Sequence, residues 1–405
     1  MEKLIDKFIR YVKIETTSDE SQEVKQPSSD KEFDLAKLLK KELEDMGLNV
    51  ALSEYGYVYA KIDSNIDGKP ALCFIAHMDT SPDASGKNVN PKIWEDYQGD
   101  DLYLNDNMLL LFDDNPVLSK SIGKTIITTD GTTLLGADDK AGISEIMCMA
   151  EYVTQNKDFK HGDIYIVFTP DEEIGRGTDN FDFNLCRADY GYTVDGGSLG
   201  ELEYENFNAA SMTIEVHGKT IHPGDAKNKM KNAIRIFEEF DSMLPSEQKP
   251  EYTDGYEGFF HVHDASGSVD YYKADYLIRE HDKTLFESKK QLANTVADFI
   301  NKKYGENTVK VTIKDSYYNM GEIIKNNFHL ILNAKKAMEN TGVKPNVVPI
   351  RGGTDGARLS YMNLPCANLS TGGQNYHSVY EFAIKEDMEK MVEVILEIIR
   401  IYAGE

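Results

Sequence analysis

Positive charge, cysteine and long apolar runs are all scarce in this sequence. Its 405 residues include 44 lysines and arginines against 69 aspartates and glutamates, which gives a formal net charge of −25. So acidic a chain repels nucleic acids and anionic membranes, and neither is expected as a partner. No stretch approaches the roughly 20 apolar residues that a membrane span requires.

The few cysteines argue against a fold held by disulfides. They are Cys73, Cys148, Cys186 and Cys366, which lie far apart and form no CxxC pair. This usage is typical of buried thiols in a reducing compartment, so we expect a cytoplasmic protein. The first residues, MEKLIDKFIRYVK, carry apolar side chains at helical spacing, which predicts an amphipathic helix rather than a signal peptide.

Strand and helix patterns alternate over the first 206 residues. Apolar runs predict strands over 57–62, 71–76, 125–129, 164–169 and 190–194, and helices over 33–46 and 141–153. The segment 81–120 is rich in Asn, Asp and Pro and is expected to be a loop. This alternation predicts an α/β layered domain with a mostly parallel central sheet.

A second pattern begins near Asn206. Residues 210–314 show the order βαββαβ, which predicts an inserted ferredoxin-like domain. The α/β alternation then resumes, with a helix over 321–339, a strand over 347–350 and helices over 355–361 and 385–402. We therefore expect one domain from residues 1–206 and 316–405, interrupted by a second domain from residues 207–315.

Five motifs with acidic or imidazole side chains follow predicted strand ends, where an open α/β sheet presents its ligand crevice. They are AHMDT, GADDKAG, TPDEEIG, YTVDGG and TGGQNYH. Each has a plain structural alternative, such as a surface His-x-Asp pair, a helix N-cap or a turn. Their coincidence at the strand ends of one sheet favours a common site.

The residue types of these motifs suit metal ions. His77 and Asp79 are two residues apart in extended chain, so Asp79 can hold one ring nitrogen of His77 while the other binds a metal. Asp171, Glu172 and Glu173 place three carboxylates together, which a crevice tolerates only with cations.

The donor set is sufficient for two Zn²⁺ ions per chain if one carboxylate bridges them. Its members are His77, Asp138, Glu173, Asp195 and His377. Two zinc ions and three carboxylates leave one positive charge, which a bridging hydroxide neutralises, and that hydroxide is a hydrolytic nucleophile. Glu172 remains free to act as general base and to pass the proton to a leaving amine.

Seven motifs in one order resemble the peptidase T family, the tripeptide aminopeptidase branch of the M20 co-catalytic zinc hydrolases. They are AHMDT, LLGADDKAG, FTPDEEIG, YTVDGG, HPGDAK, RGGTDGARLS and TGGQNYH. The resemblance implies a zinc-binding α/β domain interrupted by a lid domain. It also implies specific roles: one zinc on His77 and Asp195, the other on Glu173 and His377, Asp138 as the bridge, Glu172 as the base, Asp79 orienting His77, and a cis peptide bond between Asp138 and Asp139.

Three residues outside the metal set are implied as substrate-binding. His222 in TIHPG resembles the lid histidine that reaches the scissile carbonyl oxygen, although a turn residue before Pro223 is the alternative. Arg351 in RGGTDG and Arg279 in YLIRE resemble anchors for the terminal carboxylate, because arginine can bind it with two hydrogen bonds. A surface ion pair is the alternative for Arg279.

We therefore predict a cytoplasmic hydrolase that releases the N-terminal residue from tripeptides and forms a homodimer through its lid domain. Two alternatives stay open. The first is another M20-type activity, such as dipeptide cleavage or deacylation of an N-acyl amino acid. The second is a peptide-binding or metal-storing protein without turnover, against which Glu172 speaks, because storage needs no spare carboxylate beside a ligand.

Overall fold

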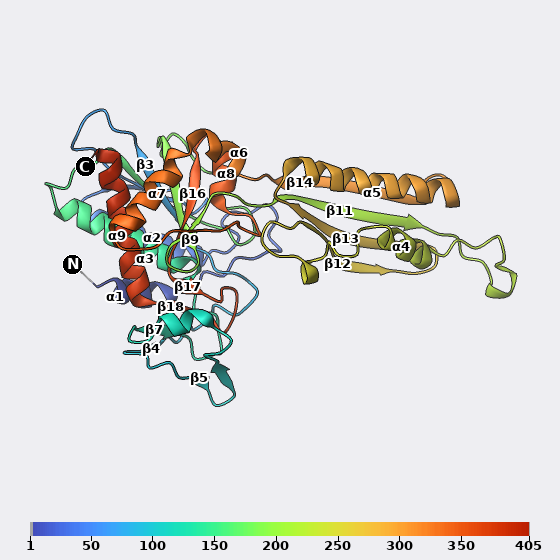
Figure 1. Ribbon diagram of the computed structural model, residues 1–405, viewed down its shortest axis with the longest axis horizontal. Coiled ribbons are helices and arrows are strands. Elements are labelled where there is room, and N and C mark those ends of the chain that lie inside the picture. Colours follow the sequence, from blue (N-terminus) through green and yellow to red (C-terminus); the bar gives the residue numbers. More distant parts are fainter. Residues whose placement is uncertain (1–2, 405) are drawn as a thin grey trace. The chain divides into compact units, whose positions relative to one another are not determined.

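The computed structural model describes residues 3–404, which form two compact units (Figure 1). The first unit comprises residues 3–204, 322–348 and 354–404, and the second comprises residues 205–321 and 349–353. The second unit is thus inserted within the sequence of the first. The short segment 349–353, which belongs to the second unit, was predicted to lie in the first domain.

The first unit contains an eight-stranded sheet. Its strands, in spatial order, are β1 (Asn49–Leu52), β2 (Val58–Ile62), β8 (Ile164–Thr169), β3 (Leu72–His77), β9 (Tyr190–Gly196), β16 (Cys366–Ser370), β10 (Glu201–Glu203) and β15 (Asn346–Val347). The four central strands, from β8 to β16, run parallel, whereas β2 and β10 flank them antiparallel. The predicted α/β class with a mostly parallel central sheet is therefore confirmed.

Helices pack on both faces of this sheet. The helices of the first unit include α1 (Leu4–Val12), α2 (Glu32–Asp45), α3 (Ala137–Gln155), α7 (His329–Asn340), α8 (Asp355–Tyr361) and α9 (Lys385–Ala403). On β3, Cys73 clusters with Leu359 of α8, whereas the next residue, Phe74, stacks on Tyr192. The Tyr192 hydroxyl donates to the Leu330 carbonyl in α7. Successive side chains of a strand point to opposite faces, so β3 is buried from both sides.

A smaller sheet corrects one prediction from the sequence. Its strands are β17 (Gly373–Gln374), β18 (Phe382–Ile384), β7 (Ile126–Thr128) and β4 (Lys92–Trp94), and the hairpin of β5 (Leu102–Asn105) and β6 (Met108–Leu110) lies beside them in one hydrophobic cluster. The segment 81–120, expected to be a loop, thus carries three strands and the 3-10 helix η1 (Pro116–Lys120). Strands of three or four residues are too short to show a periodic pattern.

The helix predicted over 321–339 is interrupted. It divides into α6 (Gly321–Ile324), the 3-10 turn η4 (Lys325–Asn327) and α7. Asn326 and Asn327 stand at the break, and the Asn327 side chain donates to the Ile323 carbonyl. Asparagine side chains compete for backbone hydrogen bonds, which weakens a helix interior.

The second unit has the predicted βαββαβ order. Its elements are β11 (Asn208–His217), α4 (Ala233–Ser242), β12 (Phe259–Gly267), β13 (Tyr271–Glu280), α5 (Lys283–Tyr304) and β14 (Val309–Tyr317), with the 3-10 turns η2 (Pro223–Asp225) and η3 (Pro250–Tyr252). The antiparallel strand order β12-β13-β11-β14 is that of a ferredoxin-like sheet. Both helices pack on one face, where Met212 and Ile214 of β11 meet Phe240 of α4 and Phe286 of α5.

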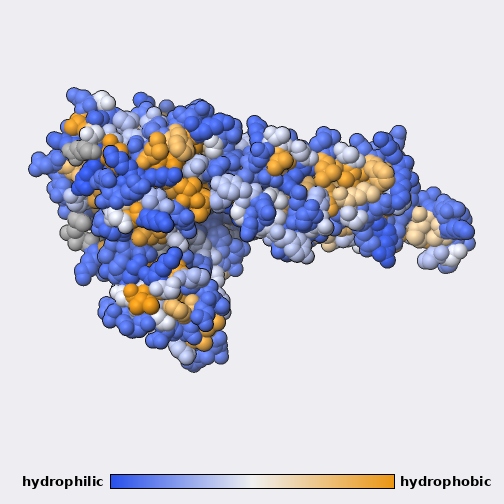
Figure 2. Space-filling view, in the orientation of Figure 1, coloured by the Kyte–Doolittle hydropathy of each residue, from blue (hydrophilic) through white to orange (hydrophobic). Residues whose placement is uncertain are grey.

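The visible face of the molecule is mostly hydrophilic (Figure 2), in keeping with the large net charge. Some large apolar side chains, such as Ile93 and Tyr103, are exposed, which is normal for a protein surface. Among the helices of residues 3–404, none has the length and apolar character to cross a bilayer. All four cysteines are free and buried, as predicted.

One buried carboxyl group in α3 lies away from any hydrogen-bonding group of the described residues. Glu145 is fully buried, and neither of its carboxyl oxygens has a hydrogen-bond partner among the described residues. Burial raises the pKa of Glu145 well above its usual value. The folded protein therefore keeps this carboxyl protonated at pH values where an exposed glutamate is ionised.

This burial predicts a pH-dependent gain in stability for Glu145→Gln. Above about pH 4.3 the unfolded chain releases a proton that folded Glu145 retains, so the wild type loses stability as the pH rises towards the folded pKa. Glutamine has no proton to release, so the free energy of unfolding of the variant should rise relative to the wild type by up to about 1.4 kcal/mol for each pH unit in this range. Denaturant unfolding of both metal-free proteins at pH 5 and pH 8 measures it, with exposed Glu339→Gln as control. An unfolding difference that is the same at both pH values would contradict the prediction.

Candidate metal centre

The first unit brings together all seven residues predicted for the metal site, although not from one sheet. His77, Glu172 with Glu173, and Asp195 lie at or just beyond the carboxyl ends of β3, β8 and β9 in the main sheet. Asp138 instead begins α3, and His377 lies between β17 and β18 of the smaller sheet. The expectation of one sheet was therefore wrong, because β7 and β17 pair with β18 and not with the main sheet.

Two groups of donor atoms share the carboxylate of Asp138. In the first group, His77 Nε2 lies 2.8 Å from Asp138 Oδ1 and 3.4 Å from Asp195 Oδ1. In the second, His377 Nε2 lies 3.4 Å from Asp138 Oδ2 and 2.8 Å from Glu173 Oε2. Each oxygen of Asp138 thus faces a different histidine, which is the geometry of a carboxylate that bridges two cations.

The spacing of these atoms suits zinc. Tetrahedral ligands about 2.0 Å from Zn²⁺ lie roughly 3.3 Å from one another, close to the observed separations. Glu173 Oε1 is buried and has no hydrogen-bond partner among the described residues, as expected of an oxygen available to a cation. Glu172 also offers an oxygen within 4.8 Å of donor atoms of His77 and Asp195. The residues therefore fit two metal ions with Glu172 beside them.

The electrostatics of the cluster also favour cations. Burial raises the pKa of Glu173 and of Asp195 to about 7 each, with repulsion from Asp138 adding to it. Hydrogen bonds to Asp138 and Glu173 raise the pKa of His377 to about 11. Without metal, protons bound to these side chains reduce the repulsion between the carboxylates. A metal ion that binds here must displace those protons.

The orientation of His77 is fixed by Asp79. His77 Nδ1 lies 3.0 Å from the main-chain oxygen of Asp79 and 3.4 Å from its carboxylate, which leaves Nε2 for a metal. The buried carboxylate of Asp79 also accepts the backbone N–H groups of Glu172 and Glu173, at 2.9 and 3.1 Å. Asp79 therefore positions a histidine and the loop that carries two more site residues.

Two positioning carboxylates were not predicted from the sequence. Buried Glu381 accepts the backbone N–H groups of Leu135, Gly136 and Asp138, at 2.7, 2.7 and 3.0 Å. Asp139 accepts the backbone N–H of His77 at 3.3 Å. The peptide bond between Asp138 and Asp139 is cis, as the resemblance implied. The loops that carry His77, Asp138 and Glu173 are thus each hydrogen-bonded by a carboxylate from another of the ligand-bearing loops.

The three predicted substrate-binding residues lie in the second unit. His222 is exposed, and its ring accepts the backbone N–H of Gly224 at the start of η2. The Arg279 guanidinium lies over the Tyr317 ring, 5.3 Å from its centroid. Among the described residues its one hydrogen-bond acceptor is the main-chain oxygen of Ile278, at 3.3 Å.

Arg351 has partners that the prediction did not include. Its terminal nitrogens donate to the main-chain oxygens of Thr253, Gly255 and Glu257 and to the Thr253 hydroxyl, at 2.8–3.2 Å. The guanidinium also lies over the Phe207 ring. Arg351 thus fastens residues 349–353 to the loop after η3, and a carboxylate would have to displace these contacts.

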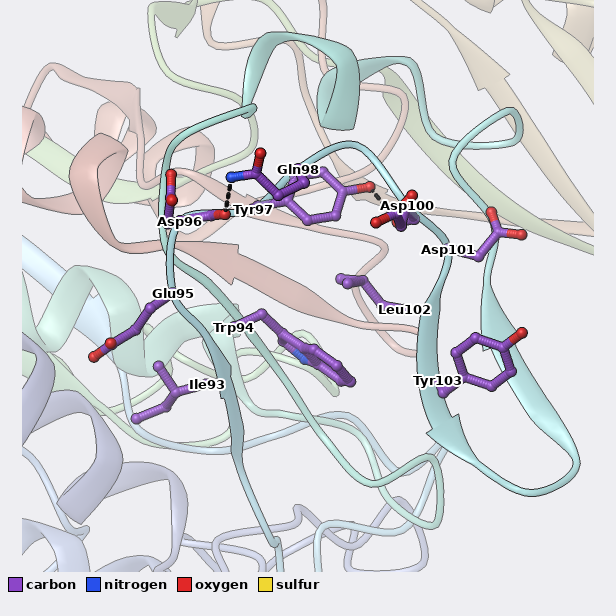
Figure 3. Close-up of a pocket in the computed structure, with 10 residues that line it drawn as sticks. All are labelled: Ile93, Trp94, Glu95, Asp96, Tyr97, Gln98, Asp100, Asp101, Leu102 and Tyr103. Carbon is purple, nitrogen blue, oxygen red and sulfur yellow. Dashed lines mark hydrogen bonds between the residues drawn. The ribbon is translucent and has the colours of Figure 1, made fainter.

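A second concavity lies between β4 and β5 (Figure 3). The side chains of Trp94 and Leu102 point towards its middle, and acidic side chains surround it. The Trp94 indole N–H is already bonded to the Thr128 hydroxyl, and no histidine lines the space. Nothing here offers the mixed nitrogen and oxygen donors of the metal centre.

Comparisons with known proteins identify relatives of this chain and of its fold. Residues 204–308 match the model of a peptidase dimerisation domain of the M20 type. The chain is 55% identical to the protein called peptidase T of Halothermothrix orenii, with all of both chains covered. A tripeptidase from Staphylococcus aureus has a similar fold, with a TM-score of 0.80, 23% identity and coverage of 100% and 98%. A Bacillus subtilis protein described as a dinuclear metal-binding M20 peptidase has a TM-score of 0.67, 14% identity and coverage of 99% and 98%.

Proposed function

The chain belongs to the peptidase T family of M20 peptidases, and from this premise we propose that it is a dizinc aminopeptidase that releases the N-terminal residue from tripeptides. The family membership confirms the resemblance seen in the motifs. One observation carries the proposal: the two oxygens of Asp138 face different histidines, and each of these histidines also lies within 3.4 Å of one further carboxylate. We propose His77, Asp138 and Asp195 as ligands of one zinc and His377, Asp138 and Glu173 as ligands of the other.

The bound ions would polarise the scissile carbonyl and lower the pKa of the attacking water. Glu172 is not needed as a ligand and is held beside the centre by its backbone N–H bond to Asp79. Burial raises the pKa of Glu172, and the neighbouring carboxylates of Asp195 and Asp355 raise it further. A base of raised pKa accepts the proton of the water and returns it readily to the leaving amine.

The experiment that tests the function compares three peptides on the zinc-loaded protein: a free tripeptide, its N-acetylated form and a dipeptide. Mass spectrometry of the products should show one amino acid and one dipeptide from the free tripeptide, and little from the others. Faster cleavage of the dipeptide or of the acetylated peptide would identify one of the alternative M20-type activities instead. Cleavage of none would favour a binding protein.

The two arginines allow a sharper prediction about the terminal carboxylate. Arg279 has no carboxylate partner among the described residues, whereas Arg351 is bonded to main-chain oxygens, so we assign the substrate carboxylate to Arg279. Losing a charge-assisted hydrogen bond costs about 1.5–3 kcal/mol. Arg279→Ala should therefore lower kcat/KM on a tripeptide roughly 10- to 150-fold and add little to the loss seen with the tripeptide amide.

Arg351→Ala is the matched comparison. It should lower the unfolding temperature, because three carbonyls lose their donor, and should affect acid and amide substrates equally. If instead Arg351→Ala lowers kcat/KM on the free tripeptide and adds little to the loss caused by amidation, then Arg351 binds the carboxylate, as the resemblance implied.

Three further parts complete the proposal. The role of His222 on the scissile carbonyl stays a prediction of the resemblance. Homodimer formation through the second unit is supported by the match of residues 204–308 to a dimerisation domain. A cytoplasmic location is supported by four cysteines that are all free and buried.

A further inference from the structure

An aminopeptidase must recognise the free α-ammonium group of its substrate. The proposed metal ligands bind the metal ions, so another residue is needed for this group. The group is cationic near neutral pH, so a carboxylate with an accessible oxygen is the natural partner. That carboxylate must lie near the metal centre, because the α-nitrogen is only two bonds from the scissile carbonyl carbon.

Most carboxylates around the centre are already engaged. Three are candidate ligands and Glu172 is the proposed base. Four more are buried and bound to protein N–H or O–H groups: Asp79, Asp139, Asp355 and Glu381. None of these four has an oxygen that a substrate can approach.

Asp83 differs from all of them. Its Oδ2 atom accepts the His377 Nδ1–H at 3.0 Å and the Ser81 hydroxyl at 3.1 Å. Its side chain is nevertheless 66% exposed, and Oδ1 has no hydrogen-bond partner among the described residues. The ring of His377 presents Nδ1 to Asp83 and Nε2 to Asp138 and Glu173. The accessible oxygen is thus one imidazole ring away from the donor atoms of the second group.

The loop after β3 explains how Asp83 reaches this place. Residues 77–83 supply His77 to one donor group, Asp79 to the loop of Glu172 and Glu173, and Asp83 to His377 of the other group. The Ser81 hydroxyl holds Asp83 Oδ2 on the histidine, so Oδ1 is directed elsewhere.

We propose that Asp83 binds the α-ammonium group of the substrate through Oδ1 while its Oδ2 orients His377. This inference rests on the proposed function and adds the residue that makes the enzyme select free N-termini. An N-acylated substrate would bring no cationic group to the exposed Oδ1 of Asp83.

Asp83→Asn tests the proposal, because asparagine retains an oxygen that can accept from His377 but lacks the charge. The probes are trialanine and propionyl-dialanine, which has the same shape without the amine. We expect kcat/KM for trialanine to fall about 10- to 150-fold in Asp83→Asn. For propionyl-dialanine, kcat/KM, or its inhibition constant where turnover is too slow, should stay within about twofold of the wild type. Exposed Asp106→Asn in the turn between β5 and β6 is the matched control and should change neither probe.

A metal titration accompanies the kinetics. Asp83→Asn should still bind two zinc ions, since its remaining oxygen holds His377. An equal loss on both probes, or no loss on trialanine, would overturn the proposal, as would loss of one zinc ion in step with activity. Failure of the zinc-loaded wild type to cleave trialanine would instead overturn the proposed function and this inference with it.

Discussion

Replacing Asp138 with asparagine is expected to weaken the binding of both metal ions at once. The two oxygens of Asp138 face different histidines, so its loss removes one charged ligand from each group. Loss of a partner outside the ligand shell already costs about 10- to 100-fold in metal affinity, and a shared ligand should cost at least that much for each ion. Activity should fall below detection at zinc concentrations that saturate the wild type.

Zinc titration against a competing chelator measures this effect. Asp67→Asn is a suitable control, since this exposed residue lies in the turn before β3, at the end of the strand opposite His77. A variant Asp138→Asn that loses only one ion would show that Asp138 does not bridge, and the assignment of ligands would have to change.

The neighbouring residues Glu172 and Glu173 allow the second large effect to be tested with a matched pair. Glu172→Gln should bind two zinc ions like the wild type, yet kcat should fall about 10²-fold or more, because the proton acceptor is gone. Glu173→Gln should lose affinity for one ion, because Glu173 Oε2 lies 2.8 Å from His377 Nε2. Metal content and kcat, measured on both variants, separate a base from a ligand. The reverse outcome would mean that the two roles are exchanged.

The clustering of the candidate ligands could be predicted from the sequence because they sit in short motifs after recognisable strands. His77 and Glu173 follow β3 and β8, which are continuous apolar runs. Their chemistry is also restrictive, since three carboxylates in succession demand a cation. The sheet from which each ligand comes could not be predicted. Asp138 and His377 belong with strands of two or three residues, and β7 pairs with β18, which lies more than 250 residues further along the chain, as in Thr128 with Phe382.

The positioning residues Glu381 and Asp139 escaped prediction for a different reason. Glu381 acts on backbone N–H groups of residues 135–138, and such a role depends on the path of the main chain and leaves no side-chain signature. Arg351 shows the converse case. Its motif resembles a carboxylate anchor, yet the loop at 253–257 presents carbonyl oxygens to the same nitrogens. Which acceptor an arginine meets is decided by tertiary structure.

Anomalous diffraction from crystals of the zinc-loaded protein, recorded on both sides of the zinc absorption edge, tests the central claim most directly. The account predicts two peaks that share Asp138, one beside His77 and Asp195 and the other beside His377 and Glu173, with Glu172 outside both ligand sets. A single peak, or zinc bound elsewhere while this cluster holds none, would contradict it.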